Sequence, residues 1–179
     1  RMINNGFSPA STNGREAEQR EVYRTLAGFA AHAGATGRCL EIGSGFGHGL
    51  PLIAAAGAWS VEGVDGRRIA SATCRLRGRA ARYAESTQPP FEDASFDHVL
   101  GVECVVCLDD PPAGMAEIAR ILKPGGALSI AEFRLAKPRG AQRKLAEMAA
   151  DAGLTLTDFE DVSDRARASV VAQARARAK

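Results

Sequence analysis

The chain has 179 residues with a formal net charge of +2, and 45% of its residues are hydrophobic, 25% charged and 6% aromatic. This size and composition predict one globular domain with a single core, and the nearly balanced charge gives no global preference for nucleic acid or an anionic membrane. No apolar run reaches the ~20 residues that a membrane span needs, and no signal-peptide pattern opens the chain, so we expect a cytoplasmic protein.

Strand-like and helix-like segments alternate along the chain after an irregular arm over residues 1–14, which is rich in Asn, Ser, Gly and Pro. The expected elements, in chain order, are a helix over 15–33, a strand over 39–42, a helix over 50–57, a strand over 59–65, a helix over 67–77, strands over 82–84 and 96–108, a helix over 112–122, a strand over 127–133, a helix over 140–152 and a strand over 154–162. This alternation predicts an α/β fold with a doubly wound, mostly parallel sheet that binds its ligands at the carboxyl ends of the strands. We expect the arm to be a lid, one domain over 15–162, and a helical tail over 163–179.

A glycine-rich turn follows the first strand, where residues 41–49 read Glu-Ile-Gly-Ser-Gly-Phe-Gly-His-Gly. Glycine at alternate positions leaves one wall of the turn without side chains, so a ligand can lie against bare backbone. The N-terminus of the next helix favours a carboxylate or another anion. A nicotinamide or flavin fingerprint would need a glycine at position 48, which is His48. The spacing therefore disfavours a dinucleotide-dependent dehydrogenase.

The second predicted strand ends on an acid, Asp65, which follows Gly43 by 22 residues. At this distance a βαβ unit delivers a carboxylate to the ribose hydroxyls of an adenosine ligand. Capping of the next helix is the alternative role, and one carboxylate can serve both. We favour the ribose role because the spacing and the strand-end position coincide.

Cys104 and Cys107 have the spacing of metal or redox sites, but no second Cys or His pair completes a zinc site. Free cysteines are often buried as small apolar residues. We therefore expect reduced cysteines and no metal.

Four landmarks follow one another along residues 38–134: the glycine turn, Asp65, the segment 90–97 (Pro-Phe-Glu-Asp-Ala-Ser-Phe-Asp) and the segment 117–126 (Glu-Ile-Ala-Arg-Ile-Leu-Lys-Pro-Gly-Gly). Together they resemble class I S-adenosylmethionine-dependent methyltransferases, and the last two are typical of the small-molecule branch. The resemblance implies a Rossmann-like methyltransferase fold with S-adenosyl-L-methionine as the cofactor.

The resemblance also implies a cofactor site made of Glu41, Gly43, Gly45, Gly47, Asp65, Glu85, Ser86, Glu103 and Cys104. The first four would border the methionine part of the cofactor, and Asp65 would hold its ribose. Glu85 and Ser86 would border adenine, with Glu85 near the exocyclic amine. Glu103 and Cys104 would lie beside the transferring methyl group.

A narrower likeness concerns bacterial natural-product methyltransferases, which act on sugars, polyketides and phenolic glycolipids, mostly at oxygen. It rests on residues 5–7 (Asn-Gly-Phe), 102–103 (Val-Glu) and 131–134 (Ala-Glu-Phe-Arg). In that branch the N-terminal arm folds over the cofactor, so the resemblance implies that Phe7 forms part of a lid over the substrate.

Two features depart from that branch. Many of its members carry a histidine base after the fourth strand, where residues 105–107 of this chain are Val-Val-Cys, and such side chains cannot accept a proton at neutral pH. Relatives also continue into substrate-covering helices and a final antiparallel strand, whereas this sequence stops at Lys179. We therefore expect the C-terminal lid and last strand to be missing, because the chain is truncated or because another subunit, as in a homodimer, completes the pocket.

His48 and Glu103 are the candidate catalytic bases that remain. His48 is the only histidine near the predicted cofactor, with helix capping or packing against the cofactor as its alternative role. Glu103 has cofactor contact as its competing role.

The leading hypothesis is a methyltransferase of secondary metabolism that methylates a small-molecule acceptor at oxygen, with neither nucleic acid nor membrane as a partner. Transfer to nitrogen or carbon is the nearest rival. The other alternative is a silent binding protein that holds S-adenosylmethionine without turnover or supports an active partner.

Overall fold

The computed structural model describes residues 20, 22–28, 36–57, 59–84, 88–105, 108–132, 138–160 and 170–176. Residues 22–28 are helical, within the helix predicted over 15–33. The other elements, in chain order, are β1 (Gly37–Ile42), α2 (Leu50–Ala55), β2 (Trp59–Asp65), α3 (Arg68–Leu76), β3 (Ala81–Tyr83), β4 (Phe96–Val102), α4 (Pro111–Ile121), β5 (Leu122–Glu132), α5 (Pro138–Asp151), β6 (Leu154–Glu160) and β7 (Val170–Ala176).

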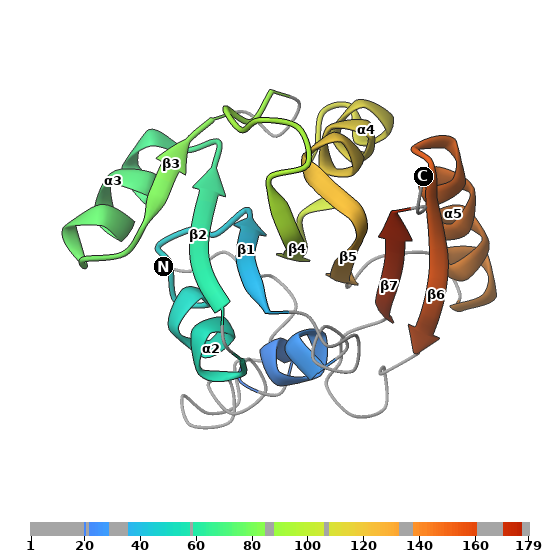
Figure 1. The fold of residues 1–179 in the computed structure, drawn as a ribbon, viewed down its shortest axis with the longest axis horizontal. Helices are drawn as coiled ribbons and strands as arrows, with labels where there is room; N and C mark the ends of the chain where they lie inside the picture. Colours follow the sequence, from blue (N-terminus) through green and yellow to red (C-terminus); the bar gives the residue numbers. More distant parts are fainter. Residues whose placement is uncertain are drawn as a thin grey trace.

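These strands form one sheet in the order β3-β2-β1-β4-β5-β7-β6 (Figure 1). The strands from β3 to β5 in that order are parallel, whereas β7 is antiparallel to both of its neighbours. Along the chain, β2 and β3 are added on one side of β1, and β4 and β5 are then added on its other side. The strand order therefore reverses between β1 and β4. The predicted doubly wound, mostly parallel α/β sheet is confirmed.

The C-terminal segment corrects one prediction. Residues 163–179 were expected to form a helical tail and the last strand to be missing, but Val170–Ala176 form β7. Ala and Arg favour helices, yet this preference amounts to less than ~1 kcal/mol per residue and tertiary context overrides it. Because β7 lies between β5 and β6 and pairs with both, its backbone groups gain partners along both edges.

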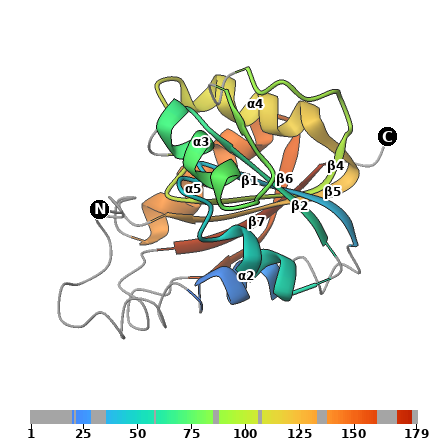
Figure 2. The same cartoon turned by 90° about the vertical axis from the view of Figure 1, so that its left-hand side faces the viewer.

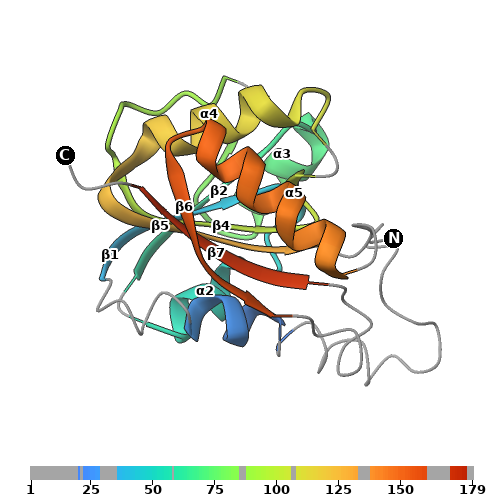
Figure 3. The same ribbon diagram turned by 90° about the vertical axis from the view of Figure 1, so that its right-hand side faces the viewer.

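Helices cover both faces of the sheet: α3, α4 and α5 lie on one face, and α2 and the helical residues 22–28 lie on the other (Figures 2 and 3). Alternate side chains of β1 serve the two faces. Leu40 and Ile42 join the core cluster beneath α4, whereas Cys39 packs in the cluster beneath the N-terminal helix. Glu41 therefore points to the same face as Cys39, toward that helix and α2.

The inward face of α3 differs from the one that its apolar pattern predicts. The apolar spacing of this helix predicts that Ile69 and Leu76 point inward, but they are 78% and 89% exposed, and the small residues Ser71 and Cys74 are buried instead. The glycine turn explains the difference, because a Cβ atom at Gly47 would overlap Sγ of Cys74. The helix packs so close to the turn that only small side chains fit between them.

We expect Gly47→Ala to lower the free energy of unfolding for two reasons. Its φ of +75° costs a residue with a side chain about 1–2 kcal/mol, and the overlap with Cys74 adds about 1 kcal/mol or more. Gly78→Ala is the matched control, since Gly78 has a φ of +72° and nothing within 4 Å of an added Cβ. Urea unfolding of both variants should show the larger loss for Gly47→Ala.

A double-mutant cycle isolates the overlap. In a Cys74→Ala background, the loss caused by Gly47→Ala should shrink toward that of Gly78→Ala in the natural chain, with only the close approach to Cδ of Arg79 at 3.2 Å remaining. Equal losses for the two single variants would contradict the tight packing of α3 on the turn.

Candidate functional site

Three neighbouring parallel strands end at one edge of the sheet: β1 at Ile42, β2 at Asp65 and β4 at Val102. Open α/β sheets bind ligands beyond the carboxyl ends of their strands, at the point where the strand order reverses. The reversal lies between β1 and β4, which places the glycine turn (residues 43–49), Asp65 and residues 103–105 around it. We call these residues, with Glu41, the candidate site.

The glycines of the turn have different surroundings. Gly43, Gly45 and Gly47 have φ values of 69°, 55° and 75°, in the left-handed region that side chains other than glycine's rarely allow. An added Cβ atom would lie 3.7 Å from Cβ of Cys104 at Gly43 and 3.6 Å from Nη2 of Arg67 at Gly45, which are ordinary van der Waals contacts without overlap. We call this uncrowded side the open side of the turn. Gly47 instead packs against α3. Of the three predicted contacts, two thus lie on the open side of the turn.

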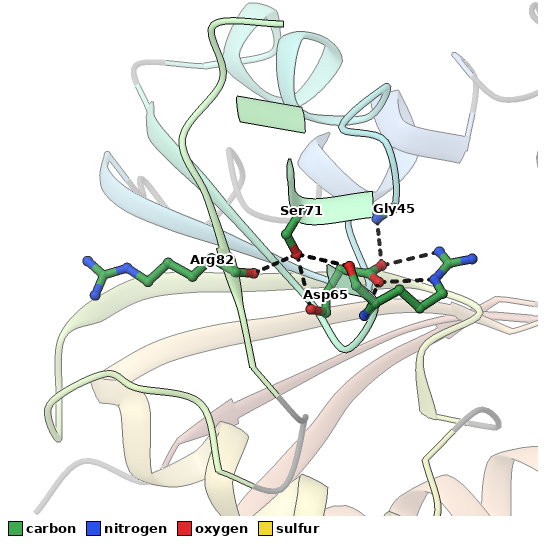
Figure 4. Close-up of polar contacts among 5 residues, drawn as sticks. Gly45, Asp65, Ser71 and Arg82 are labelled. Carbon is green, nitrogen blue, oxygen red and sulfur yellow. Dashed lines mark hydrogen bonds and ion pairs between the residues drawn. The ribbon is translucent and has the colours of Figure 1, made fainter. Parts of the chain in front are cut away.

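The Asp65 side chain ties the tip of β2 to the glycine turn and is only 5% exposed. Oδ2 accepts a hydrogen bond from the Gly45 N–H at 2.8 Å, and Oδ1 accepts one from the Arg67 N–H at 2.9 Å. Behind it, the Ser71 hydroxyl donates at 3.2 Å to the Asp65 carbonyl oxygen and at 3.1 Å to that of Arg82, which links β2, α3 and β3 (Figure 4). Asp65 does not cap α3, whose N-cap is Arg67 without a side-chain hydrogen bond.

The Arg67 side chain closes the remaining side of the Asp65 carboxylate, with Nε 3.1 Å from Oδ1 and Nη2 3.3 Å from Oδ2. A carboxylate has about four acceptor positions, and two backbone and two side-chain N–H groups occupy them here. Nη2 also lies 3.6 Å from where a Cβ atom of Gly45 would stand, over the open side of the turn. An arginine among the other arginines of this helix is most simply part of a solvated face, so the sequence gives no signal for this contact, and the Arg67 side chain is 61% exposed.

Glu41 is buried beneath the turn with 1% of its surface exposed, and the Tyr23 hydroxyl donates to its Oε1 at 2.5 Å. A Cβ atom at Gly49 would overlap both Oε1 and the Tyr23 ring, so glycine at this position makes room for the pair. Burial raises the pKa of Glu41 to about 8, although the hydrogen bond from Tyr23 lowers it. Sequence reasoning missed Tyr23, because helical spacing identifies the apolar residues that face the core and gives no signal for a tyrosine that donates to a distant acid.

His48, a predicted base, lies on the α3 side of the turn and is exposed. Its Nε2 is 2.9 Å from Nη1 of Arg77, and since a guanidinium only donates, this nitrogen is the acceptor. Partial burial, followed by the charges of Arg77 and Arg79, lowers the pKa of His48. The same two arginines donate to the carbonyl oxygens of Phe46 and Gly47. These surroundings favour the neutral ring of His48, but its Nε2 lone pair is engaged by Arg77.

The chain leaves β4 in a strained conformation. Glu103 has a φ of 51°, and non-glycine residues held in this region often lie at functional sites. Cys104 is buried, with Cβ 3.7 Å from the added Cβ position of Gly43. The N–H of Val105 donates at 2.8 Å to Oε1 of Glu132, which is 1% exposed and which the sequence did not suggest as a site residue. The structure therefore brings Cys104 against Gly43 of the turn.

The predicted adenine contacts Glu85 and Ser86 and the predicted lid residue Phe7 lie outside the described residues. Among the residues that are described, no group of three or more His, Cys, Asp or Glu side chains is placed to hold a metal ion. Within the same ranges, no helix is long and apolar enough to cross a membrane.

Comparison with known proteins matches residues 40–130 to the methyltransferase domain family. The chain is 32% identical over 104 residues to an O-methyltransferase of Pyrenophora dematioidea, covering 54% of this chain and 39% of that protein. It is 37% identical over 106 residues to the demethylmenaquinone methyltransferase of Clavibacter sepedonicus, covering 54% and 41%. The chain thus spans about two fifths of the length of these relatives.

Among solved structures, the fold is similar to that of the [4+2]-cyclase SpnF, with a TM-score of 0.76, 20% identity, and coverage of 99% of this chain and 89% of that chain. At this level of identity the likeness concerns the fold alone. The matched stretch of residues 40–130 contains the glycine turn, Asp65 and residues 103–105, and it makes up half of the sequence. The chain belongs to the methyltransferase domain family.

Proposed function

We propose that this chain binds S-adenosyl-L-methionine in the candidate site and transfers its methyl group to an oxygen of a small-molecule acceptor of secondary metabolism. One observation carries the proposal: the open side of the glycine turn lies beside the buried Asp65 carboxylate, with the Gly45 N–H 2.8 Å from Oδ2. An adenosine ligand needs side-chain-free backbone next to an acid that can hold its ribose hydroxyls. Membership of the methyltransferase family and the O-methyltransferase of Pyrenophora dematioidea support this activity.

The described residues fit this cofactor. Gly43 and Gly45 offer a wall that a side chain would fill, and Asp65 offers a carboxylate at the tip of β2. The buried Glu41 lies beneath the turn, where the family resemblance places the methionine part of the cofactor. Cys104 adds a small, buried side chain beside Gly43.

When bound, the cofactor supplies a methyl group on a positively charged sulfur, which is already activated for in-line displacement. The chain must therefore align the acceptor and exclude water, and alignment alone can contribute roughly 7–11 kcal/mol. We assign this positioning to residues 103–105, whose strained entry at Glu103 and hydrogen bond from Val105 to Glu132 fix the backbone beside the turn.

The acceptor must lose a proton when oxygen is methylated. Of the two predicted bases, His48 is the weaker candidate, since its Nε2 lone pair is engaged by Arg77. The branch's histidine base is replaced by valine at position 106, so an acidic hydroxyl suits this site better than an alcoholic one, and a phenol such as that of tyrosine ionises at about pH 10. We therefore propose a phenolic hydroxyl rather than a sugar hydroxyl as the acceptor group.

Two alternatives are tested by the same assay. Transfer to nitrogen or carbon is the first, and a protein that holds the cofactor without turnover is the second. Incubation with methyl-labelled cofactor and matched phenol, sugar and amine acceptors should label the phenols. Label on amines alone would support nitrogen transfer, and tight cofactor binding with no transfer to any acceptor would support the silent binding protein.

We expect Asp65→Asn to weaken S-adenosylmethionine binding by about 1–3 kcal/mol, the range for a hydrogen bond to a charged group. Calorimetry measures the dissociation constant, and thermal unfolding checks that the variant is folded. Asp151→Asn, at an exposed position at the end of α5, is the control and should leave the affinity unchanged. Unchanged affinity in Asp65→Asn would remove Asp65 from the site.

Arg67→Ala should strengthen cofactor binding by up to about five-fold, because ribose hydroxyls must displace the guanidinium from Asp65 and exposed ion pairs contribute roughly 0.2–1 kcal/mol. Arg68→Ala is the matched control, since the Arg68 guanidinium lies 4.6 Å from the centroid of the Tyr83 ring. Added salt should reduce the difference between Arg67→Ala and the natural chain. Weaker binding in Arg67→Ala would mean that the guanidinium holds the cofactor rather than competing with it.

A further inference from the structure

Tyr23 and Glu41 form a polar pair whose residues come from separate elements, with Glu41 buried and Tyr23 partly buried. Tyr23 lies in the helical residues 22–28, outside the stretch that matches the methyltransferase family, and Glu41 lies in β1. The phenol donates to Oε1 at 2.5 Å. The absence of a side chain at Gly49 is required, since a Cβ atom there would overlap both partners. The chain is thus built around this contact at three separate positions.

The second carboxyl oxygen of Glu41 has no such partner. Oε2 is buried and accepts no hydrogen bond from any residue in the described part of the chain. Burying a carboxylate oxygen without a partner costs several kcal/mol unless the group is protonated or a ligand completes it. Because Oε1 is taken by Tyr23, a proton on the neutral carboxyl would lie on Oε2.

The charged and titratable groups around Glu41 do not neutralise it by direct contact. Burial is the largest cause and raises the pKa of Glu41, the hydrogen bond from Tyr23 lowers it, the charge of Asp65 on β2 raises it, and the charge of Arg79 lowers it, with about 8 as the result. Cys39 of the same strand is neutral, since burial and then Glu41 raise the pKa of its thiol. Burial and then Glu41 raise the pKa of Tyr23, and Cys104 adds to this increase.

We propose that Tyr23 is a positioning residue that holds Glu41 so that Oε2 accepts a hydrogen bond from the ammonium group of the bound cofactor, with release of the carboxyl proton to solvent. The ammonium group belongs to the methionine part of the cofactor, so the inference rests on the proposed function. One O–H bond breaks at Oε2, the proton leaves to the buffer, and the resulting carboxylate faces the ammonium cation. Cofactor binding and deprotonation of Glu41 are therefore linked.

Calorimetry at pH 6.5 tests the linkage directly. Titrations in buffers of different ionisation enthalpy should report about one proton released for each S-adenosylmethionine bound, since a free α-amino group of pKa ≈ 7.7–8.0 remains charged at this pH. The comparison ligand is 5′-methylthioadenosine, which has the adenosine and sulfur parts but no ammonium group. It should bind without proton release. Binding of neither ligand would sink the proposed function, whereas binding of both with equal proton release would overturn only the present inference.

The variants separate positioning from structure. Tyr23→Phe should weaken S-adenosylmethionine binding by about tenfold at pH 6.5. The hydrogen bond from Tyr23 stabilises the carboxylate form of Glu41, so its removal makes that form harder to reach. The same variant should leave methylthioadenosine binding unchanged. Tyr83→Phe, at a half-exposed tyrosine beneath Arg68, is the matched control and should change neither. Equal weakening of both ligands by Tyr23→Phe would reveal a merely structural role.

Glu41→Gln provides a readout that needs no ligand. The natural folded chain keeps the Glu41 proton between pH 4.5 and about 8, where the unfolded chain releases it. Its free energy of unfolding should therefore fall as pH rises through this window and level off above it. Glu41→Gln should flatten that part of the urea-unfolding profile and abolish proton release on cofactor binding. A profile that keeps its slope in Glu41→Gln would overturn the inference.

Discussion

The hydrogen bond between the Gly45 N–H and the Asp65 carboxylate joins the ends of two neighbouring strands, and the geometry of the candidate site depends on it. Parallel pairing sets the register, with Ile42 opposite Val64, so the turn after β1 and the acid at the end of β2 arrive at the same height. The left-handed φ of Gly45 then aims its N–H at Oδ2. Backbone geometry, rather than a choice of side-chain rotamers, therefore fixes where a ligand can lie.

Sequence reasoning could predict the parts of this arrangement that depend on local pattern. The bounds of β2 at Trp59 and Asp65 agree with the prediction, because a short apolar run that ends on an acid before a helical pattern leaves little choice. The alternating glycines likewise predicted the turn, because they are a local pattern that leaves little choice of structure. The spacing of Gly43 and Asp65 indicated that turn and acid lie together, since the length of a βαβ unit is tightly limited.

Contacts between distant segments could not be read in this way. The Tyr23–Glu41 pair joins residues 18 positions apart, and its signal was a glycine at position 49 whose reason is visible only in three dimensions. The exposed Ile69 and Leu76 show the same limit, since helical spacing gives a face but not its direction when small residues such as Cys74 allow closer approach. The segment of β7 has a sequence that favours helix, but it forms a strand because it pairs with the edges of both β5 and β6.

The two buried acids of the site differ in the number of hydrogen-bond donors around them, and this difference bears on how a zwitterionic ligand would be oriented. Asp65 receives four N–H groups and needs none from a ligand until Arg67 moves, so its charge is compensated within the chain. Glu41 receives one hydroxyl and lacks a cation in direct contact among the described residues, so burial favours its neutral form. An incoming ammonium group would therefore gain the most stabilisation at Glu41. At Asp65, neutral ribose hydroxyls would replace the solvent-exposed guanidinium of Arg67, which costs little free energy. The chain's own donors thus distinguish the two acids of the candidate site before any ligand arrives.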